Sequence, residues 1–117
     1  MKMRFILSSA VITAPGTYRY RHINLEQARQ WIEAAPFHST IRYVETARAL
    51  SALVGRKIGT RNETVKMKPG DEALVFRLVF PPGTRGLPTD KKGKVSVEYI
   101  LDHCELGILE SVVTPGQ

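Results

Sequence analysis

The clearest regularity in the chain is a helical one between residues 24 and 36. Apolar residues recur there at the spacing of one helix face, at Leu25, Ala28, Ile32 and Ala35. Asn24, followed by Gln27 three residues later, has the arrangement of a capping box. Pro36 disfavours the helical conformation of the residue before it. The pattern therefore predicts a helix over Leu25–Ala35.

A second apolar stripe predicts another helix that ends near Val54. The stripe consists of Val44, Ala47, Leu50, Leu53 and Val54. Ser39-Thr40 is one candidate cap, and Thr46 is a candidate for a later start. Gly55 suits the C-terminal cap, where the backbone often takes a left-handed conformation.

Short apolar and alternating runs predict the strands. Pro69 and Gly70 lie between two of them, and a proline followed by a glycine is typical of a turn. The alternation of aromatic and basic residues over Tyr18–His22 predicts a short exposed strand. The predicted strands are Met3–Ser8, Tyr18–His22, Thr64–Met67, Ala73–Phe80 and Gly107–Thr114.

The order of these elements predicts the fold class. Pro81–Lys94 is rich in proline, glycine and lysine and is expected to be a loop, after which Ser96 caps a short helix that runs through His103. Two helices follow one another without a strand between them, which excludes a simple repeat of strand and helix. We therefore expect an α/β protein in which helices pack on a small mixed sheet. Residues 1–117 suit one domain with one core.

Charge and composition narrow the partners and the compartment. The chain has 17 Lys and Arg against 11 Asp and Glu, and residues 1–97 carry all 17 bases but only seven acids, a net of +10. Such a surface attracts polyanions, although basic surfaces without a specific partner are also common. One cysteine, Cys104, permits no internal disulfide, so an intracellular location is expected. No apolar run approaches the ~18 residues of a membrane span.

Several kinds of chemistry have no support in the sequence. The three histidines, His22, His38 and His103, do not stand at metal-ligand spacing from other ligands, so neither a metal nor a cofactor is predicted. Neither a phosphate-binding glycine loop nor a nucleophile elbow is present. The two consecutive helices resemble a helix-turn-helix only loosely, because their connection lacks glycine and the second helix offers few basic residues.

The start of the second helix is the most suggestive region for binding an anion. A helix N-terminus presents backbone N–H groups and the positive end of the helix dipole. Hydroxyl groups, a phenol and a guanidinium gather there, from Ser39, Thr40, Arg42, Tyr43 and Thr46. These side chains suit a phosphate. On composition and spacing alone, ordinary capping of a surface helix is the simpler explanation.

Taken in order, several segments of the chain resemble the viral ring-nuclease (type III anti-CRISPR) family. This family was first met in archaeal viruses and also occurs in phages and mobile elements. The resemblance covers the opening strand and loop, both helices, the central hairpin and the last strand, at residues 5–18, 23–29, 46–55, 65–78 and 105–110.

The resemblance implies a fold and an activity. Members have a mixed sheet of about five strands flanked by helices and form a two-fold dimer. A cyclic tetra-adenylate, the second messenger of type III CRISPR defence, binds across the dimer cleft. Active members cut it without a metal, through attack by the ligand's own 2′-hydroxyl, with a histidine as general acid and support from an acidic residue and arginines. The expected location is the cytoplasm, that of the host cell if the protein is viral.

The match departs from the family at the position of the catalytic histidine. The corresponding frame reads Ile41-Arg42-Tyr43-Val44-Glu45-Thr46-Ala47, so Tyr43 takes the place of the histidine. A phenol is a weaker acid than imidazolium near neutral pH. It is nevertheless able to stack on a base or to donate a hydrogen bond to a phosphate.

Other functional positions are also altered. One family arginine corresponds to Asn62, with Arg61 beside it, while Arg85 corresponds to a second family arginine in an expanded loop. Asp90 in that loop stands in for the family acid. The resemblance thus assigns Tyr43, Arg85 and Asp90 to the catalytic positions. It assigns ligand binding to Ser8, Ser9, Thr40, Arg42, Thr46, Arg61 and Asn62.

Three functions remain open at this point. The first is a homodimer that binds a cyclic oligoadenylate and sequesters it or degrades it slowly. The replacement of the catalytic histidine favours this function, because the loss of a general acid typically lowers a reaction rate about 10²–10⁴-fold. The second is a fully active ring nuclease that does not use a metal. The third is a module on the same scaffold that binds nucleic acid or protein.

Overall fold

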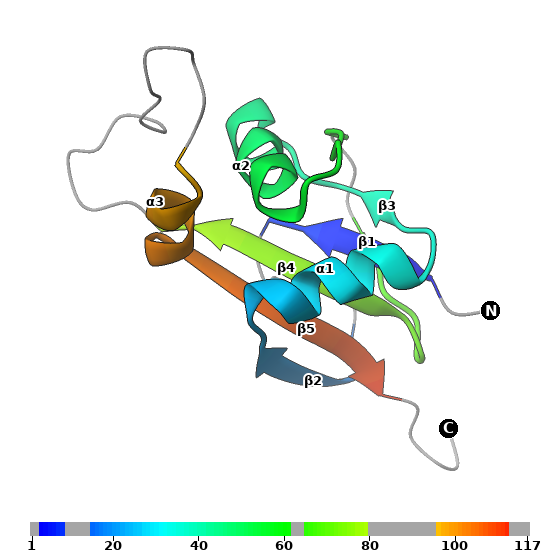
Figure 1. Ribbon diagram of the computed structural model, residues 1–117. Helices are drawn as coiled ribbons and strands as arrows, with labels where there is room; N and C mark the ends of the chain where they lie inside the picture. The colour runs from blue at the N-terminus through cyan, green and yellow to red at the C-terminus, as the bar shows by residue number, and fades with distance from the viewer. Residues whose placement is uncertain (1–2, 9–14, 62–64, 80–95, 113–117) are drawn as a thin grey trace.

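The computed structural model describes residues 3–8, 15–61, 65–79 and 96–112, which form a five-stranded sheet and three helices (Figure 1). The strands are β1 (Arg4–Leu7), β2 (Thr17–His22), β3 (His38–Ser39), β4 (Glu72–Leu78) and β5 (Cys104–Val112). The helices are α1 (Leu25–Ala34), α2 (Val44–Val54) and α3 (Val97–Asp102). The expected α/β class, with one domain of helices on a small mixed sheet, is confirmed.

The sheet combines parallel and antiparallel pairs in the order β2-β5-β4-β1-β3. The short strand β1 runs parallel to both of its neighbours, β3 and β4. The long strand β5 runs antiparallel to β4 and to the edge strand β2. Consequently the carboxyl ends of β1 and β4 lie side by side at one end of the sheet.

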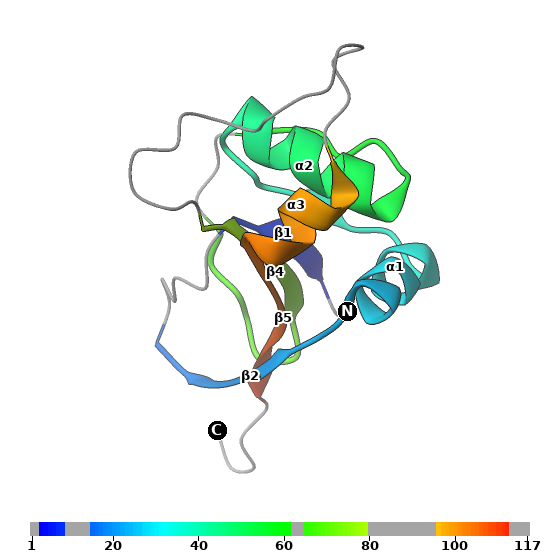
Figure 2. The ribbon, with the colours of Figure 1, turned by 60° about the vertical axis from the view of Figure 1, so that its left-hand side comes forward.

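The three helices pack on one face of this sheet, as Figure 2 shows. The main core lies between them and the sheet, and its largest fully buried side chains include Phe76, Ile6 and Ile32. A smaller apolar cluster covers part of the opposite face, where Met67 packs with Ala73, Val75 and Leu109. The sheet is therefore buried on one face by helices and partly on the other by side chains and coil.

The structure confirms the helix caps and the turn that were predicted from local sequence signals. In α1 the capping box is complete: the Gln27 N–H donates to Asn24 Oδ1 over 2.8 Å, and the Asn24 N–H donates to Gln27 Oε1 over 2.9 Å. Gly55 ends α2 with φ of 70°, and Gly70 takes φ of 96° in the predicted turn. Ser96 caps α3 as expected.

The predicted start of α2 is wrong. The helix begins at Val44, after Tyr43 as its N-cap, rather than at Ser39-Thr40 or at Thr46. His38 and Ser39 instead extend along β1 as β3. The Thr40 hydroxyl donates to the Ile6 carbonyl over 2.8 Å, and this bond helps to hold the segment extended.

The predicted strand at Thr64–Met67 is also wrong over the part that the structure describes. Residues 65–67 form no strand, and Val65 and Met67 pack on the sheet instead of pairing at its edge. The last strand begins earlier than predicted, at Cys104 rather than at Gly107. The predicted loop Pro81–Lys94 lies outside the described residues. None of the described helices has the length and apolar character needed to cross a membrane.

Candidate functional site

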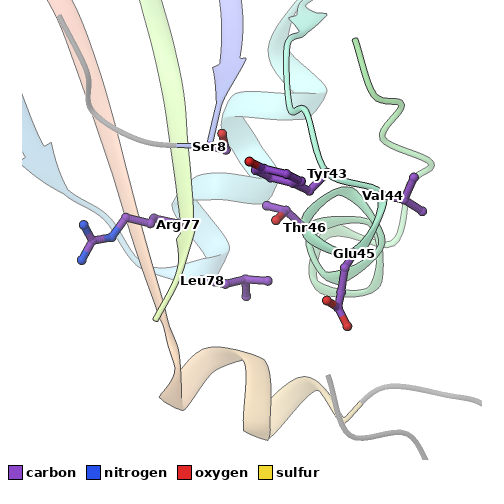
Figure 3. Close-up of a pocket in the computed structure, with 7 residues that line it drawn as sticks. All are labelled: Ser8, Tyr43, Val44, Glu45, Thr46, Arg77 and Leu78. Atoms are coloured by element: carbon purple, nitrogen blue, oxygen red, sulfur yellow. The ribbon is translucent and has the colours of Figure 1, made fainter. Parts of the chain in front are cut away.

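A hollow of about 570 Å³ opens where the parallel strands β1 and β4 end and α2 begins (Figure 3). Open α/β sheets characteristically bind ligands outside the carboxyl ends of their strands. Ser8 follows β1, Leu78 ends β4, and the first turn of α2 supplies further lining. The residues around the hollow are Ser8, Tyr43, Val44, Glu45, Thr46, Arg77 and Leu78.

The start of α2 gives the hollow its polar character. The first N–H groups of an α-helix have no partner within the helix, and they carry the positive end of its dipole. A polar N-cap usually satisfies one of them, but the Tyr43 side chain forms no such bond. Tyr43 is instead 69% exposed.

The Tyr43 ring extends from the helix start toward Ser8, and Thr46 lies beneath it (Figure 3). The buried residue Ile41 anchors the chain two positions earlier, so that the following residues emerge at the surface. An aromatic face suits stacking with a nucleobase, and hydroxyls beside a helix start suit a phosphate. The described lining thus combines features that a nucleotide requires. Glu45 adds one negative charge to it.

Arg77 contributes to the hollow from the other side, but its guanidinium points away from Tyr43 (Figure 3). Its Nε lies 3.8 Å from Glu105 Oε2 on the neighbouring strand. The other carboxylate oxygen of Glu105 accepts a hydrogen bond of 2.6 Å from the Tyr20 hydroxyl. Burial, and then the Glu105 carboxylate, raise the pKa of Tyr20 to about 12. These three side chains link β4, β5 and β2 beside the hollow.

The residues expected from the sequence occupy different places. Ser8, Tyr43 and Thr46 line the hollow together. Thr40 is buried below the surface, bonded to the Ile6 carbonyl, and does not line the hollow.

Arg42 and Arg61 are exposed and are not among the lining residues. The Arg61 N–H donates to the Ile41 carbonyl over 2.9 Å, so its backbone supports the segment before α2. Four expected site residues lie outside the described part of the chain: Ser9, Asn62, Arg85 and Asp90.

Part of the lining was not predicted from the sequence. Val44, Glu45, Arg77 and Leu78 were not expected there. Arg77 and Leu78 end an apolar run. Their place beside the hollow can be recognised only when β4 is known to run parallel to β1. The described lining contains no histidine. Across the described ranges, no three His, Cys, Asp or Glu side chains gather as a metal site would require.

Comparison with known proteins identifies the family. The sequence profile of the STIV B116-like family matches residues 4–83. The chain belongs to this family. A further relative is the uncharacterized protein YddF of Bacillus subtilis (strain 168), 31% identical over 74 residues, which cover 62% of this chain and 68% of YddF.

The solved structures give the same fold. B116 of Sulfolobus turreted icosahedral virus superimposes with a TM-score of 0.70 at 16% identity, over 94% of this chain and 99% of the viral one. At this identity the likeness establishes the fold alone. The comparisons thus show the family and the fold of the chain, and they do not show an activity.

Proposed function

We propose that this STIV B116-like protein binds a cyclic oligoadenylate, of the kind that signals in type III CRISPR defence, in a cleft between two copies of the chain. Binding sequesters the messenger, or precedes its slow cleavage, and so suppresses the signal. The observation that carries the proposal is the hollow of about 570 Å³ in which the exposed Tyr43 ring stands over the start of α2.

The size of the hollow favours a ligand shared by two copies. A pocket of this volume holds one molecule of drug-like size. A ring of four nucleotides is larger and has a two-fold axis. Two hollows related by the same axis would offer the ring two helix starts and two Tyr43 faces.

Sequestration fits the described lining better than rapid cleavage does. The described lining has no histidine to protonate a leaving 5′-oxygen, and the Tyr43 phenol is a weaker acid than imidazolium near neutral pH. A protein that only sequesters a messenger acts by mass action and needs tight binding rather than turnover.

The test is a calorimetric titration of the protein with cyclic tetra-adenylate, combined with chromatography of the ligand after incubation with stoichiometric protein. We expect micromolar or tighter binding and a ring that stays largely intact. No heat of binding at micromolar ligand would refute the proposal. Rapid appearance of linear adenylates would retain the ligand but replace sequestration with ring-nuclease activity.

The same preparation distinguishes the remaining alternative. A module that binds nucleic acid would retard DNA or RNA in a gel, and its affinity would fall steeply with salt. Retardation of this kind, together with indifference to cyclic tetra-adenylate, would favour that alternative.

A further inference from the structure

A second hollow, of about 310 Å³, lies between α1 and the edge strand β2. The described residues that line it all differ from those that line the hollow at α2. In Figure 1, α1 crosses one face of the sheet, and β2 forms an edge of that sheet. The second hollow is lined by Arg21, Ile23, Gln27, Gln30, Trp31 and Ile108.

Secondary structure brings these side chains together. Arg21 lies opposite Ile108 in the β2–β5 pair, and Ile108 is 2% exposed and belongs to the core beneath the helices. Arg21 therefore projects on the helix side of the sheet. Residues 27, 30 and 31 lie three and four positions apart on one face of α1. The hollow thus has an apolar floor, a cationic strand wall and an amide-rich helix wall.

The indole is held in a fixed orientation. Trp31 Nε1 donates to Glu72 Oε1 over 2.8 Å, and the Arg4 guanidinium lies 3.8 Å from the Trp31 ring centroid. A ring held in this way offers a fixed apolar surface to a ligand at little entropic cost.

The polar groups, in contrast, are available to a ligand. Gln27 Oε1 accepts the Asn24 N–H of the capping box, which leaves the amide hydrogens of Gln27 to donate elsewhere. Arg21 and Gln30 are exposed, and no described residue forms a hydrogen bond or ion pair with either side chain. None of the described residues that line this hollow carries a carboxylate.

We propose that this hollow is a binding site for a nucleoside monophosphate, separate from the cyclic oligoadenylate site. The Arg21 guanidinium matches the geometry of a phosphate. Carboxamides such as those of Gln27 and Gln30 pair with the edge of an adenine base. The indole and the isoleucines give the flat base an apolar surface. A volume of about 310 Å³ is at the lower limit of ligand pockets and suits a mononucleotide.

Trp31 provides the measurement, because it is the only tryptophan in the chain. Titration with AMP should change the tryptophan fluorescence saturably, with a sub-millimolar Kd. Arg21→Gln should raise that Kd about tenfold, since it removes a charge-assisted bond to the phosphate. Arg19→Gln is the matched control: it removes the same charge from the same strand and face, but Arg19 does not line the hollow. We expect that control to change Kd less than about twofold.

Four outcomes would overturn the proposal. One is the absence of a saturable change up to about 5 mM AMP. A second is an equal loss in both arginine variants, which would indicate diffuse attraction to a basic surface. A third is adenosine binding as tightly as AMP, since the phosphate would then contribute nothing. The fourth is a response to a Glu-Glu dipeptide without a response to AMP, which would make the occupant an acidic peptide. Circular dichroism of both variants checks that the fold is retained.

Discussion

Position 43 carries an aromatic ring where most helices carry a polar cap. Ser, Thr, Asp or Asn at an N-cap contributes about 1 kcal/mol through a bond to the first turn. Tyr43 forms no such bond, and the residue is 69% exposed beside a hollow. A residue that forgoes stability at this place is expected to serve binding, because stability and function often oppose one another at a site.

This trade-off can be measured with Tyr43→Ser. The serine hydroxyl caps the first turn of α2, so the free energy of unfolding should rise by about 0.5–1 kcal/mol. Affinity for cyclic tetra-adenylate should fall about tenfold or more, because the stacking face is lost. Urea unfolding and calorimetry measure the two effects. Tyr43→Phe is the control that retains the ring, and a loss of affinity as large as that of the serine variant would contradict stacking.

A second residue, Arg4, contributes to stability. Arg4 is 8% exposed, and its guanidinium donates to the Trp31 and Ala35 carbonyls at the end of α1 and to Glu72 Oε1 over 3.3 Å. It therefore joins β1, β4 and α1. The local sequence did not reveal this role, because the carbonyls that it caps lie 27 and 31 residues away.

Arg4→Met should lower the free energy of unfolding by about 3 kcal/mol, since it removes one charged partner of the nearly buried Glu72 carboxylate. Urea denaturation with a fluorescence readout from Trp31 measures the change. The double variant Arg4→Met/Glu72→Gln should be more stable than the single variant, because it also removes the carboxylate charge that Arg4 balances. Equal stability of the two variants would show that the ion pair contributes little.

At the scale of elements, the sequence predicted those whose signals are local. The capping box placed α1, and Gly55 placed the end of α2, since both depend on neighbours within one turn. The start of α2 was misplaced because residues 38 and 39 pair with β1, and no local pattern reports a partner more than 30 residues away. Val65 and Met67 alternate like a strand but use that alternation to cover the sheet.

The candidate site shows the same division. Ser8, Tyr43 and Thr46 could be found from polar residues at a strand end and a helix start, and from a family resemblance. Arg77 and Leu78 could not be found, because their place beside the hollow follows from the parallel pairing of β1 with β4.

The hydrogen bond from Tyr20 on β2 to Glu105 on β5 predicts that the stability of the fold depends on pH. The pKa of Tyr20 is raised from 10.0 to about 12, so the folded protein holds this proton more tightly than the unfolded chain does. The protonated Tyr20 therefore stabilises the folded state fully below about pH 10, and this stabilisation is lost as the pH rises toward 12. Tyr20→Phe lacks the titrating group, and its stability should fall less steeply over this interval. Urea unfolding at a series of pH values measures this, and an equally steep fall of the free energy of unfolding with pH in both proteins would contradict the assignment.

At the scale of the whole molecule, the net charge overstates the number of free cations. Arg29 donates to the Leu53 carbonyl at the end of α2 over 2.9 and 3.0 Å, and Arg4 and Arg56 approach carbonyls near the end of α1. Neither helix has a basic residue in its own last turn. Part of the +10 charge of residues 1–97 therefore compensates helix ends, and the excess of basic residues alone does not predict a polyanion partner.

The assembly can be tested through stoichiometry. If two hollows share one ring, calorimetry should give one cyclic tetra-adenylate per two chains, and sedimentation should give twice the 13.1 kDa mass of one chain. The reason is geometric, since each copy presents one helix start and one Tyr43 ring. Tyr43→Ser should weaken ring binding without changing the sedimenting mass if the contact between copies lies elsewhere. Binding of one ring to each strictly monomeric chain would refute the shared cleft and leave a single-copy nucleotide site at the start of α2.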